Sequence, residues 1–325
     1  MSRDFRWGFL SAGWIASEVA ADFQIAGLKI QAVGARDYAK ANEFADKFDI
    51  PNRHQGYETL VNDPEVDIVY ISTIHPLHKR DALLALSAGK HILLEKPFTI
   101  NAIEAQEIYD LAKAKKLLVM EAMWTRFLPS MNAIFDVINS GVLGEIELLI
   151  ADHSQALTHV PRLVERELGG GALLDLGIYP ISLAHRIFGN PQSITAKAKL
   201  NSEKVDATTS MIFEYAGGKQ ATMTTSFLGA GPISATIVGS LGRIEIDRSF
   251  YAQTSFRFYN QSNEVVKSYE QKIDGQGRQY QAIHVEECIA AGLTESPIMS
   301  LRESVEIMRV MDQVRAQIGV TYPTE

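Results

Sequence analysis

In the first third of the chain, short apolar runs alternate with stretches of helical character. The runs are rich in Val, Ile and Leu, and they end near Leu10, Val33, Ile71, Leu94 and Met120. Helical segments such as 38–48 and 101–115 lie between them. Strands that alternate with helices are joined by right-handed crossovers into a parallel sheet with helices on both faces. The sequence therefore predicts a doubly wound, Rossmann-type α/β domain at 1–125.

The pattern changes after about Phe127. One helical segment at 129–140 is followed by segments with period-two alternation, which lie at 145–154, 192–200, 207–215, 219–227, 233–239, 243–247 and 254–259. Tight glycine-containing turns at 216–218 and 240–242 favour hairpins. We therefore expect an α+β domain at 126–300 with a large, mostly antiparallel open sheet. This domain would bind substrate and form a dimer. A helix at 301–325, begun by a Ser300–Glu303 capping box, is expected to pack back on the first domain.

Composition and charge exclude several classes of protein. The formal net charge is −8 with no block of like charges, whereas a nucleic-acid binder carries a basic patch. Cys288 is the only cysteine, so an intrachain disulfide and a CxxC site are impossible. No segment approaches the roughly 18 apolar residues of a membrane span, and the amino terminus lacks the apolar stretch of a signal peptide. We expect no nucleic-acid or membrane partner and a cytoplasmic location.

The first strand runs into a glycine-containing turn and then a helix. Its sequence, Ser11-Ala12-Gly13-Trp14-Ile15-Ala16, is a G-x-G-x-x-A turn with serine at the first position. Such a turn presents backbone N–H groups and a helix N-terminus to a pyrophosphate. A side chain at Gly13 would obstruct the diphosphate. The turn predicts a dinucleotide site at Ser11, Gly13, Trp14 and Ile15, although similar turns also serve packing alone.

The end of the next strand selects between the two nicotinamide dinucleotides. It reads Val33-Gly34-Ala35-Arg36-Asp37. A carboxylate at this position holds the ribose 2′-hydroxyl of NAD, whereas a cation suits the 2′-phosphate of NADP. Arg36 comes first and Lys40 follows one helical turn later, which favours NADP. Asp37 leaves NAD possible, and a solvated Arg36–Asp37 pair is the alternative reading.

Two further segments carry groups suited to proton transfer. Strand 91–94 ends in Glu95-Lys96-Pro97, and the carboxyl ends of strands line the cofactor crevice of a doubly wound sheet, so Lys96 is expected beside the nicotinamide. The second segment, 169–179, contains a triple glycine, Asp175 and Tyr179. Asp175 and Tyr179 stand at i and i+4, on one face of an α-helix. Alternatively, Asp175 caps a helix and Tyr179 packs beneath it.

Seven stretches together resemble one known family over the whole chain. They are RWGFLSAGWIA, GARD, HPLHK, EKP, MEAMWTRFLP, LTHVPR and GGGALLDLGIY. The chain resembles the glucose–fructose oxidoreductase and inositol 2-dehydrogenase family, and within it the branch of dimeric dihydrodiol dehydrogenases, or NADP-dependent D-xylose dehydrogenases. The resemblance implies that Lys96 lies beside the nicotinamide and the reacting oxygen, with Pro97 cis. It also implies that Tyr179 is the general acid/base and Asp175 its electrostatic partner.

The resemblance extends the cofactor site. The family's Thr-Pro-Asn-x-x-His stretch appears here as residues 73–78, with His75 at the asparagine position. Thr73, His75, His78 and Glu95 are therefore expected to join the cofactor-binding residues. The family also implies a homodimer that pairs through the sheet of the second domain.

The substrate site is defined less sharply. Trp124, Arg126 and Phe127 follow the sixth strand and either shape a substrate wall or pack between domains. His159 is a candidate hydrogen-bonding group for the substrate. No metal is expected, because neither the pair His75 and His78 nor His284 with its neighbouring glutamates has an obvious third ligand.

These residues predict an oxidoreductase. It would transfer a hydride between NADP(H) and the CH–OH or C=O carbon of a sugar, polyol or trans-dihydrodiol. A lysine ammonium beside Tyr179 would lower the pKa of its hydroxyl, which is about 10 in the free side chain. Two alternatives are a non-catalytic NADP(H) sensor on the same fold and an NAD-dependent glycoside hydrolase. The presence of both Lys96 and Tyr179 argues against the sensor, and Arg36 counts modestly against the hydrolase.

Overall fold

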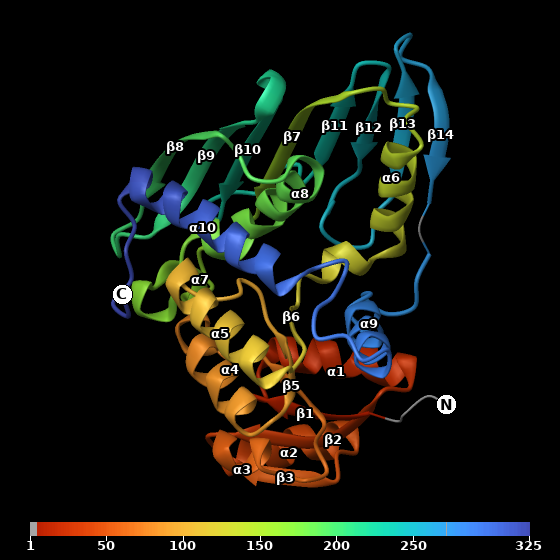
Figure 1. Ribbon diagram of the computed structural model, residues 1–325. Coiled ribbons are helices and arrows are strands. Elements are labelled where there is room, and N and C mark those ends of the chain that lie inside the picture. Colours follow the sequence, from red (N-terminus) through yellow and green to blue (C-terminus); the bar gives the residue numbers. More distant parts are fainter. Residues whose placement is uncertain (1–4, 271) are drawn as a thin grey trace. The chain divides into compact units, whose positions relative to one another are not determined.

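The structure, a computed structural model, describes residues 5–270 and 272–325 (Figure 1). The chain divides into two compact units. The first comprises Met1–Phe127 and Asp274–Val305, and the second comprises Leu128–Ile273 and Glu306–Glu325. The contiguous ranges expected from the sequence place 274–300 in the second domain, whereas here this segment returns to the first unit.

A parallel sheet forms the centre of the first unit. Its strands are β1 (Arg6–Leu10), β2 (Lys29–Ala35), β3 (Asn52–Gln55), β4 (Ile68–Ile71), β5 (His91–Leu94) and β6 (Val119–Glu121). They are ordered β3-β2-β1-β4-β5-β6, and every neighbouring pair is parallel. The order changes direction between β1 and β4, and ligands of such sheets bind beyond the carboxyl ends of the strands at this point. The predicted doubly wound fold is confirmed.

Helices connect these strands: α1 (Trp14–Ala26), α2 (Tyr38–Phe48), α3 (Tyr57–Val61), α4 (His78–Ser87) and α5 (Ala102–Lys115). From the second segment of the unit, α9 (Gln279–Ala290) packs on α1. The central strand β1 buries Trp7 and Phe9 against Phe23 of α1, with edge-to-face ring centroids 5.0 and 5.3 Å apart. Each buried aromatic side chain of this kind contributes roughly 1.5–3 kcal/mol. This packing fixes α1, and with it the turn that follows β1.

A second, larger sheet forms the other unit. Its strands are β7 (Ile146–Ser154), β8 (Ser193–Leu200), β9 (Asp206–Glu214), β10 (Gln220–Ser226), β11 (Ala235–Gly239), β12 (Gly242–Ile246), β13 (Phe256–Asn260) and β14 (Val265–Tyr269). The order is β14-β13-β12-β11-β7-β10-β9-β8, and β7 with β10 is the parallel pair among antiparallel ones. The expectation of a large, mostly antiparallel sheet is confirmed.

The two faces of this sheet differ. The helices of the second unit include α6 (Pro129–Asn139), the short α7 (Pro161–Val164) and α8 (Ile178–Phe188), and α8 packs on β7 and β10 (Figure 1). The opposite face carries an exposed row in which Ile212, Thr222 and Ile150 are cross-strand neighbours. The two isoleucines are 44% and 48% exposed. One face of the sheet is therefore core, and the other presents apolar side chains to solvent.

The last helix, α10 (Leu301–Ile318), begins as the capping pattern predicts. The Glu303 N–H donates to Ser300 Oγ at 3.1 Å. Near its other end, Gln317 Oε1 accepts from the Ala196 N–H at 2.9 Å and so ties the helix to β8. Among the helices that the structure describes, none is both long enough and apolar enough to span a bilayer.

Candidate active site

The turn after β1 has the backbone of a dinucleotide-binding loop. Ser11 adopts φ +105°, a region that glycine enters freely and other residues rarely do. Its N–H donates to Gly34 O of β2 at 3.0 Å. Serine therefore stands in the conformation of the motif's first glycine. Residues held in such sparsely populated regions cluster at ligand sites.

The space above this turn suits a phosphate. Gly13 is the N-cap of α1 and provides no side chain to satisfy the first N–H groups. A Cβ added there would contact only Ser11 Oγ, at 3.6 Å. Trp14 is 66% exposed, Ile15 is half-buried, and the first turn of α1 contains no acidic residue. The open approach and the positive helix end fit the diphosphate of a dinucleotide.

Cationic side chains lie at the end of β2. Arg36 and Lys40 are both exposed. Asp37 is the N-cap of α2, and its carboxylate accepts the Ala39 N–H at 2.9 Å. The carboxylate that left NAD possible is therefore engaged in capping a helix. Arg36 also lies close enough to Tyr57 to oppose the rise in pKa that burial causes in this phenol.

The loop after β4 is tied to the loop after β5 by His78. This ring is fully buried, with Nδ1 2.9 Å from Pro97 O and Nε2 3.0 Å from Thr73 O, and burial lowers its pKa. Thr73 Oγ1 donates to Asp81 at 2.8 Å. His75 is buried with its ring centroid 5.7 Å from that of His78. Of these predicted cofactor residues, His78 therefore connects the loop after β4 to the loop after β5.

Lys96 follows β5 at the carboxyl edge of the sheet, the edge that also carries the turn after β1. The Lys96–Pro97 peptide is cis, as the resemblance implies. The preceding Glu95 is buried, accepts the Tyr70 hydroxyl at 2.7 Å and accepts the Lys96 N–H at 3.2 Å. Burial raises the pKa of the Glu95 carboxyl. Glu95 therefore fixes the backbone at Lys96.

The residues after β6 are mostly engaged in packing. Arg126 is 3% exposed and donates to Glu303 at 2.7 Å and to Ile298 O at 3.3 Å. The Phe127 ring lies 5.1 Å from that of His284. The guanidinium of Arg278 lies over the Trp124 ring, with its Cζ 5.0 Å from the ring centroid. Of the three predicted wall residues, Trp124 is the one that forms a cation–π contact with Arg278.

The glycine segment of the second unit is packed against backbone and an acid. A Cβ at Gly170 would lie 2.7 Å from Glu165 O. Gly171 has φ +122°, and a Cβ there would collide with Asp206 Oδ1. Asp206, at the start of β9, accepts the Leu173 N–H at 2.8 Å and the Thr209 hydroxyl at 2.7 Å. The acid that holds the start of the following helix is thus Asp206, which sequence reasoning did not find.

The helix that carries Asp175 and Tyr179 is not a continuous α-helix. Leu173–Gly177 form a π-helix that leads into α8, so the segment differs from the continuous α-helix that the sequence predicted. Asp175 is buried and forms an ion pair with Arg162, with Nη1 2.7 Å from Oδ1. Single-turn π-helices within α-helices are frequent at functional sites. Arg162, the last residue of the LTHVPR stretch, is a partner of Asp175 to which sequence reasoning gave no role.

Tyr179 lies in a cluster of rings. It is 6% exposed, and its ring centroid is 5.2 Å from His153 and 4.7 Å from Tyr251, which themselves stack at 4.4 Å. His153 Nδ1 lies 3.0 Å from Leu176 O, and Gln155 Nε2 lies 2.9 Å from His153 Nε2. The carbonyl requires a proton on Nδ1, so Nε2 accepts from Gln155. His159, the other predicted residue of this region, is exposed in the turn before α7.

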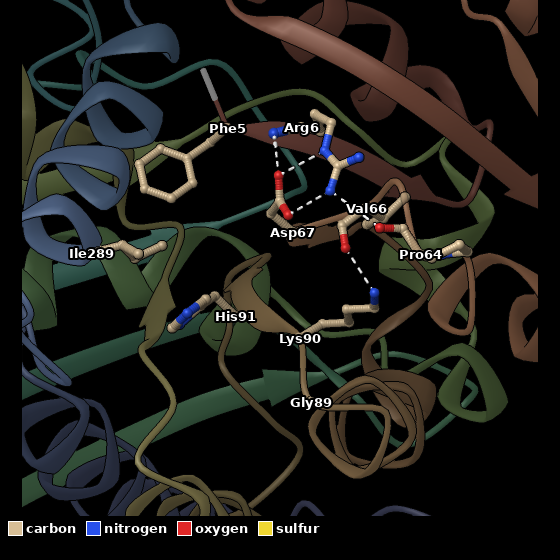
Figure 2. Close-up of a pocket in the computed structure, with 9 residues that line it drawn as sticks. All are labelled: Phe5, Arg6, Pro64, Val66, Asp67, Gly89, Lys90, His91 and Ile289. Carbon is tan, nitrogen blue, oxygen red and sulfur yellow. Dashed lines mark hydrogen bonds and ion pairs between the residues drawn. The ribbon is translucent and has the colours of Figure 1, made fainter. Parts of the chain in front are cut away.

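A cavity of about 510 Å³ lies at the opposite edge of the parallel sheet, where the strands begin (Figure 2). Its charged groups are already bound to protein. Arg6 pairs with Asp67 at 2.9 Å, and Lys90 Nζ donates to Asp63 O and Val66 O at 2.8 and 2.7 Å. His91 Nδ1 accepts the Leu118 N–H at 3.0 Å. This cavity lies away from the carboxyl edge, where such sheets bind cofactors.

Two domain families match the chain. Residues 5–123 match the oxidoreductase family with an NAD-binding Rossmann fold, and residues 131–245 match the GFO/IDH/MocA C-terminal domain. The trans-1,2-dihydrobenzene-1,2-diol dehydrogenase of Mus musculus is 37% identical over 98% of both chains. The enzyme of the same name from Xenopus tropicalis is 36% identical over 98% of this chain and 99% of its own length.

Solved structures show the same fold. An aldose–aldose oxidoreductase from Caulobacter crescentus, complexed with glycerol, has a TM-score of 0.88 at 21% identity, over 97% of each chain. A 3-ketoreductase from Actinomadura kijaniata, in complex with NADP and TDP-benzene, has a TM-score of 0.86 at 24% identity, over 97% of this chain and 98% of that one. The chain therefore belongs to the GFO/IDH/MocA family of NAD(P)-dependent oxidoreductases.

Proposed function

We propose that this protein oxidises a CH–OH group of a sugar, polyol or trans-dihydrodiol, or reduces the corresponding carbonyl, with NADP(H). The observation that carries the proposal is the position of Lys96. It follows β5 at the same sheet edge as the turn at Ser11–Gly13, where a dinucleotide would bind. The names of the relatives that are 36–37% identical support a diol or a related substrate.

The proton chemistry is assigned to two side chains. A bound nicotinamide supplies the carbon that accepts or gives the hydride. In the oxidative direction Tyr179 takes the hydroxyl proton, and in the reductive direction it returns this proton to the carbonyl oxygen. Lys96 donates a hydrogen bond to the same oxygen while negative charge develops on it. Asp175, paired with Arg162, is proposed to set the electrostatic environment of Tyr179.

A panel of sugars, polyols, trans-diols and dicarbonyls tests this function. Reduction of NADP by one class of alcohol, followed at 340 nm, is the expected result. A protein that binds NADPH yet turns over no member of the panel in either direction would favour the sensor instead. Release of a free sugar from glycosides, with no net change in the dinucleotide, would favour the glycoside hydrolase.

Preference for NADP is assigned to Arg36 and Lys40, which both stand exposed after β2. Charge-assisted hydrogen bonds contribute about 1.5–3 kcal/mol each. We therefore expect Arg36→Leu to raise the KM for NADP about tenfold to hundredfold, because it removes a partner of the 2′-phosphate. The KM for NAD, which lacks this phosphate, should change less than about twofold, since no charged contact is lost. Equal changes for both dinucleotides would contradict this assignment.

We further propose that two copies of the chain pair through the exposed face of the large sheet. The row that includes Ile212, Thr222 and Ile150 offers apolar and uncharged side chains on neighbouring strands. Exposed apolar patches of this kind mark interaction surfaces. We expect a dimer in sedimentation velocity and a monomer for Ile150→Asp, because the new carboxylate would be buried without a partner. A monomeric wild type would contradict the pairing.

A further inference from the structure

Arg278 lies at the start of α9 with hydrogen-bonding capacity that the described part of the chain does not use. Its side chain is 12% exposed. The Nε and Nη1 atoms are buried, and they donate no hydrogen bond to any residue that the structure describes within 5–270 and 272–325. Nε carries one N–H group and Nη1 carries two. Buried donors are normally satisfied, so each one that is not calls for a physical reason.

The nearby carboxylates do not satisfy these donors. Nη1 is 3.8 Å from both Glu18 Oε2 and Asp22 Oδ2, which is an ion-pair distance and too long for a hydrogen bond. The oxygens of Asp22 instead accept the backbone N–H groups of Gln276 and Arg278, both at 2.9 Å. Asp22 therefore fixes the loop that presents Arg278 and leaves Nε and Nη1 without a hydrogen-bond acceptor among the described residues.

The guanidinium faces the edge of the sheet where the reaction is proposed. It stacks on Trp124, which follows β6, at 5.0 Å from the ring centroid. It is also close enough to the Glu95 carboxyl, which follows β5, to favour the ionised form of that acid, as does Lys96. Trp124 and Glu95 both lie just beyond the carboxyl ends of neighbouring strands. Arg278 is thus a second cation on the Lys96 side of the unit.

The surroundings indicate which chemistry the donors would recognise. Glu18 and Asp22 already balance the charge of the guanidinium, and Glu95 lies nearby, so an added carboxylate or phosphate would be repelled. An uncharged hydroxyl or carbonyl oxygen meets no such repulsion and can accept from Nε or Nη1. Trp124, on whose ring the guanidinium stacks, adds no charge to these surroundings.

We propose that Arg278 is a substrate-binding, specificity-determining residue that donates hydrogen bonds to an uncharged oxygen on the carbon next to the reacting one. The assignment rests on the proposed function, because it takes Lys96 to mark the reacting carbon. Arg278 thereby selects vicinal diols and hydroxycarbonyl compounds over simple alcohols. It also selects against substrates that carry a carboxylate at that position.

Two matched pairs of compounds test the proposal. They are trans-cyclohexane-1,2-diol with cyclohexanol, and D-glucose with 2-deoxy-D-glucose. In wild type, kcat/KM should be higher for the first member of each pair. Arg278→Met should lower kcat/KM for the first members by about tenfold to hundredfold, because an oxygen that was bound is left without its donors. The values for the deoxy members and the KM for NADP should change less than about threefold. Arg278→Lys should restore part of the loss, since it keeps one cation but not the planar donor set.

Arg53→Met is the matched control. It removes a guanidinium from β3 of the same unit, where Arg53 forms an ion pair with the exposed Asp46. For each pair of compounds, the ratio of the two kcat/KM values should stay as in wild type. If Arg278→Met leaves the ratio of kcat/KM values within each pair as in wild type, whether or not both values fall, the proposal is overturned. A change confined to the KM for NADP would also overturn it.

Binding measurements separate this inference from the proposed reaction. Calorimetry on the NADP-loaded protein should show tighter binding of the diol than of cyclohexanol in wild type, and a smaller difference in Arg278→Met. Equal affinities in wild type would overturn the role of Arg278, whatever the turnover. A wild type that shows the binding difference but no turnover with any compound would support Arg278 and reject the proposed reaction.

Discussion

Replacing Tyr179 with phenylalanine should lower kcat by about 10²- to 10⁴-fold, the contribution typical of a positioned general acid/base. The change removes only the hydroxyl. The ring is 6% exposed and packs against His153 and Tyr251, so phenylalanine should keep the same packing. Binding of NADPH, measured by its fluorescence, should therefore stay within about twofold of wild type, because no dinucleotide contact is assigned to this phenol.

Tyr251→Phe is the control for this experiment. Tyr251 belongs to the same cluster, and its hydroxyl lies 3.3 Å from Gln155 Nε2. Removing that hydroxyl alters the hydrogen bonding around His153 but deletes no proposed proton donor, so the fall in kcat should be much smaller. Near-normal turnover of Tyr179→Phe would show that another group moves the proton. Equal falls in both variants would assign the effect to packing of the cluster.

Sequence reasoning succeeded where a local pattern carries the signal. The five apolar runs correspond to β1, β2, β4, β5 and β6, because central parallel strands are buried on both faces and hence continuously apolar. The edge strand β3 was missed since Asn52–Gln55 is polar and pairs with β2 alone. The edge strand β14 was missed because it is largely exposed and has no clear alternation.

The contents of the candidate site were harder to predict. The motifs indicated the elements that carry Ser11, Lys96 and Tyr179, because these residues follow strands or glycines in fixed local patterns. Nothing local marks Arg278, which reaches Trp124 from a segment about 150 residues later in the chain. Asp206 also lies outside the motifs, 33 residues after Leu173, and it reaches the helix start from the beginning of β9. Such residues are defined by tertiary contacts, which periodicity does not encode.

Asp206 also predicts an unusual pH dependence of stability. It is completely buried, and burial raises the pKa of its carboxyl to about 7 from the ordinary 3.8. The folded state therefore binds this proton more tightly than the unfolded state. Stability from Asp206 is complete below about pH 4 and is lost as the pH rises through about 7, at up to about 1.4 kcal/mol per pH unit. The full loss is on the order of 4 kcal/mol.

Glu121, in the first unit, also contributes stability that is lost as the pH rises. This buried carboxyl also has its pKa raised by burial, to about 7. Acids with the opposite shift, such as Asp67 beside Arg6, have a lowered pKa and contribute stability that is lost as the pH falls. The net slope of wild type therefore mixes both signs. Comparing each variant with wild type isolates the contribution of a single carboxyl.

Between about pH 4 and pH 7, the contribution of Asp206 makes the free energy of unfolding of wild type fall as the pH rises. We expect Asp206→Asn to remove most of this contribution. The amide oxygen can still accept from the Leu173 N–H and the Thr209 hydroxyl, so the start of the π-helix keeps its anchor. Urea unfolding at several pH values, followed by circular dichroism, measures the slope. Glu121→Gln is the matched variant in the other unit and should remove a similar part of the pH dependence of the free energy of unfolding. If Asp206→Asn unfolds with the same pH slope as wild type, the pKa of Asp206 is the same in the folded and unfolded states. Asp206 would then hold the start of the π-helix without a burial cost that depends on pH.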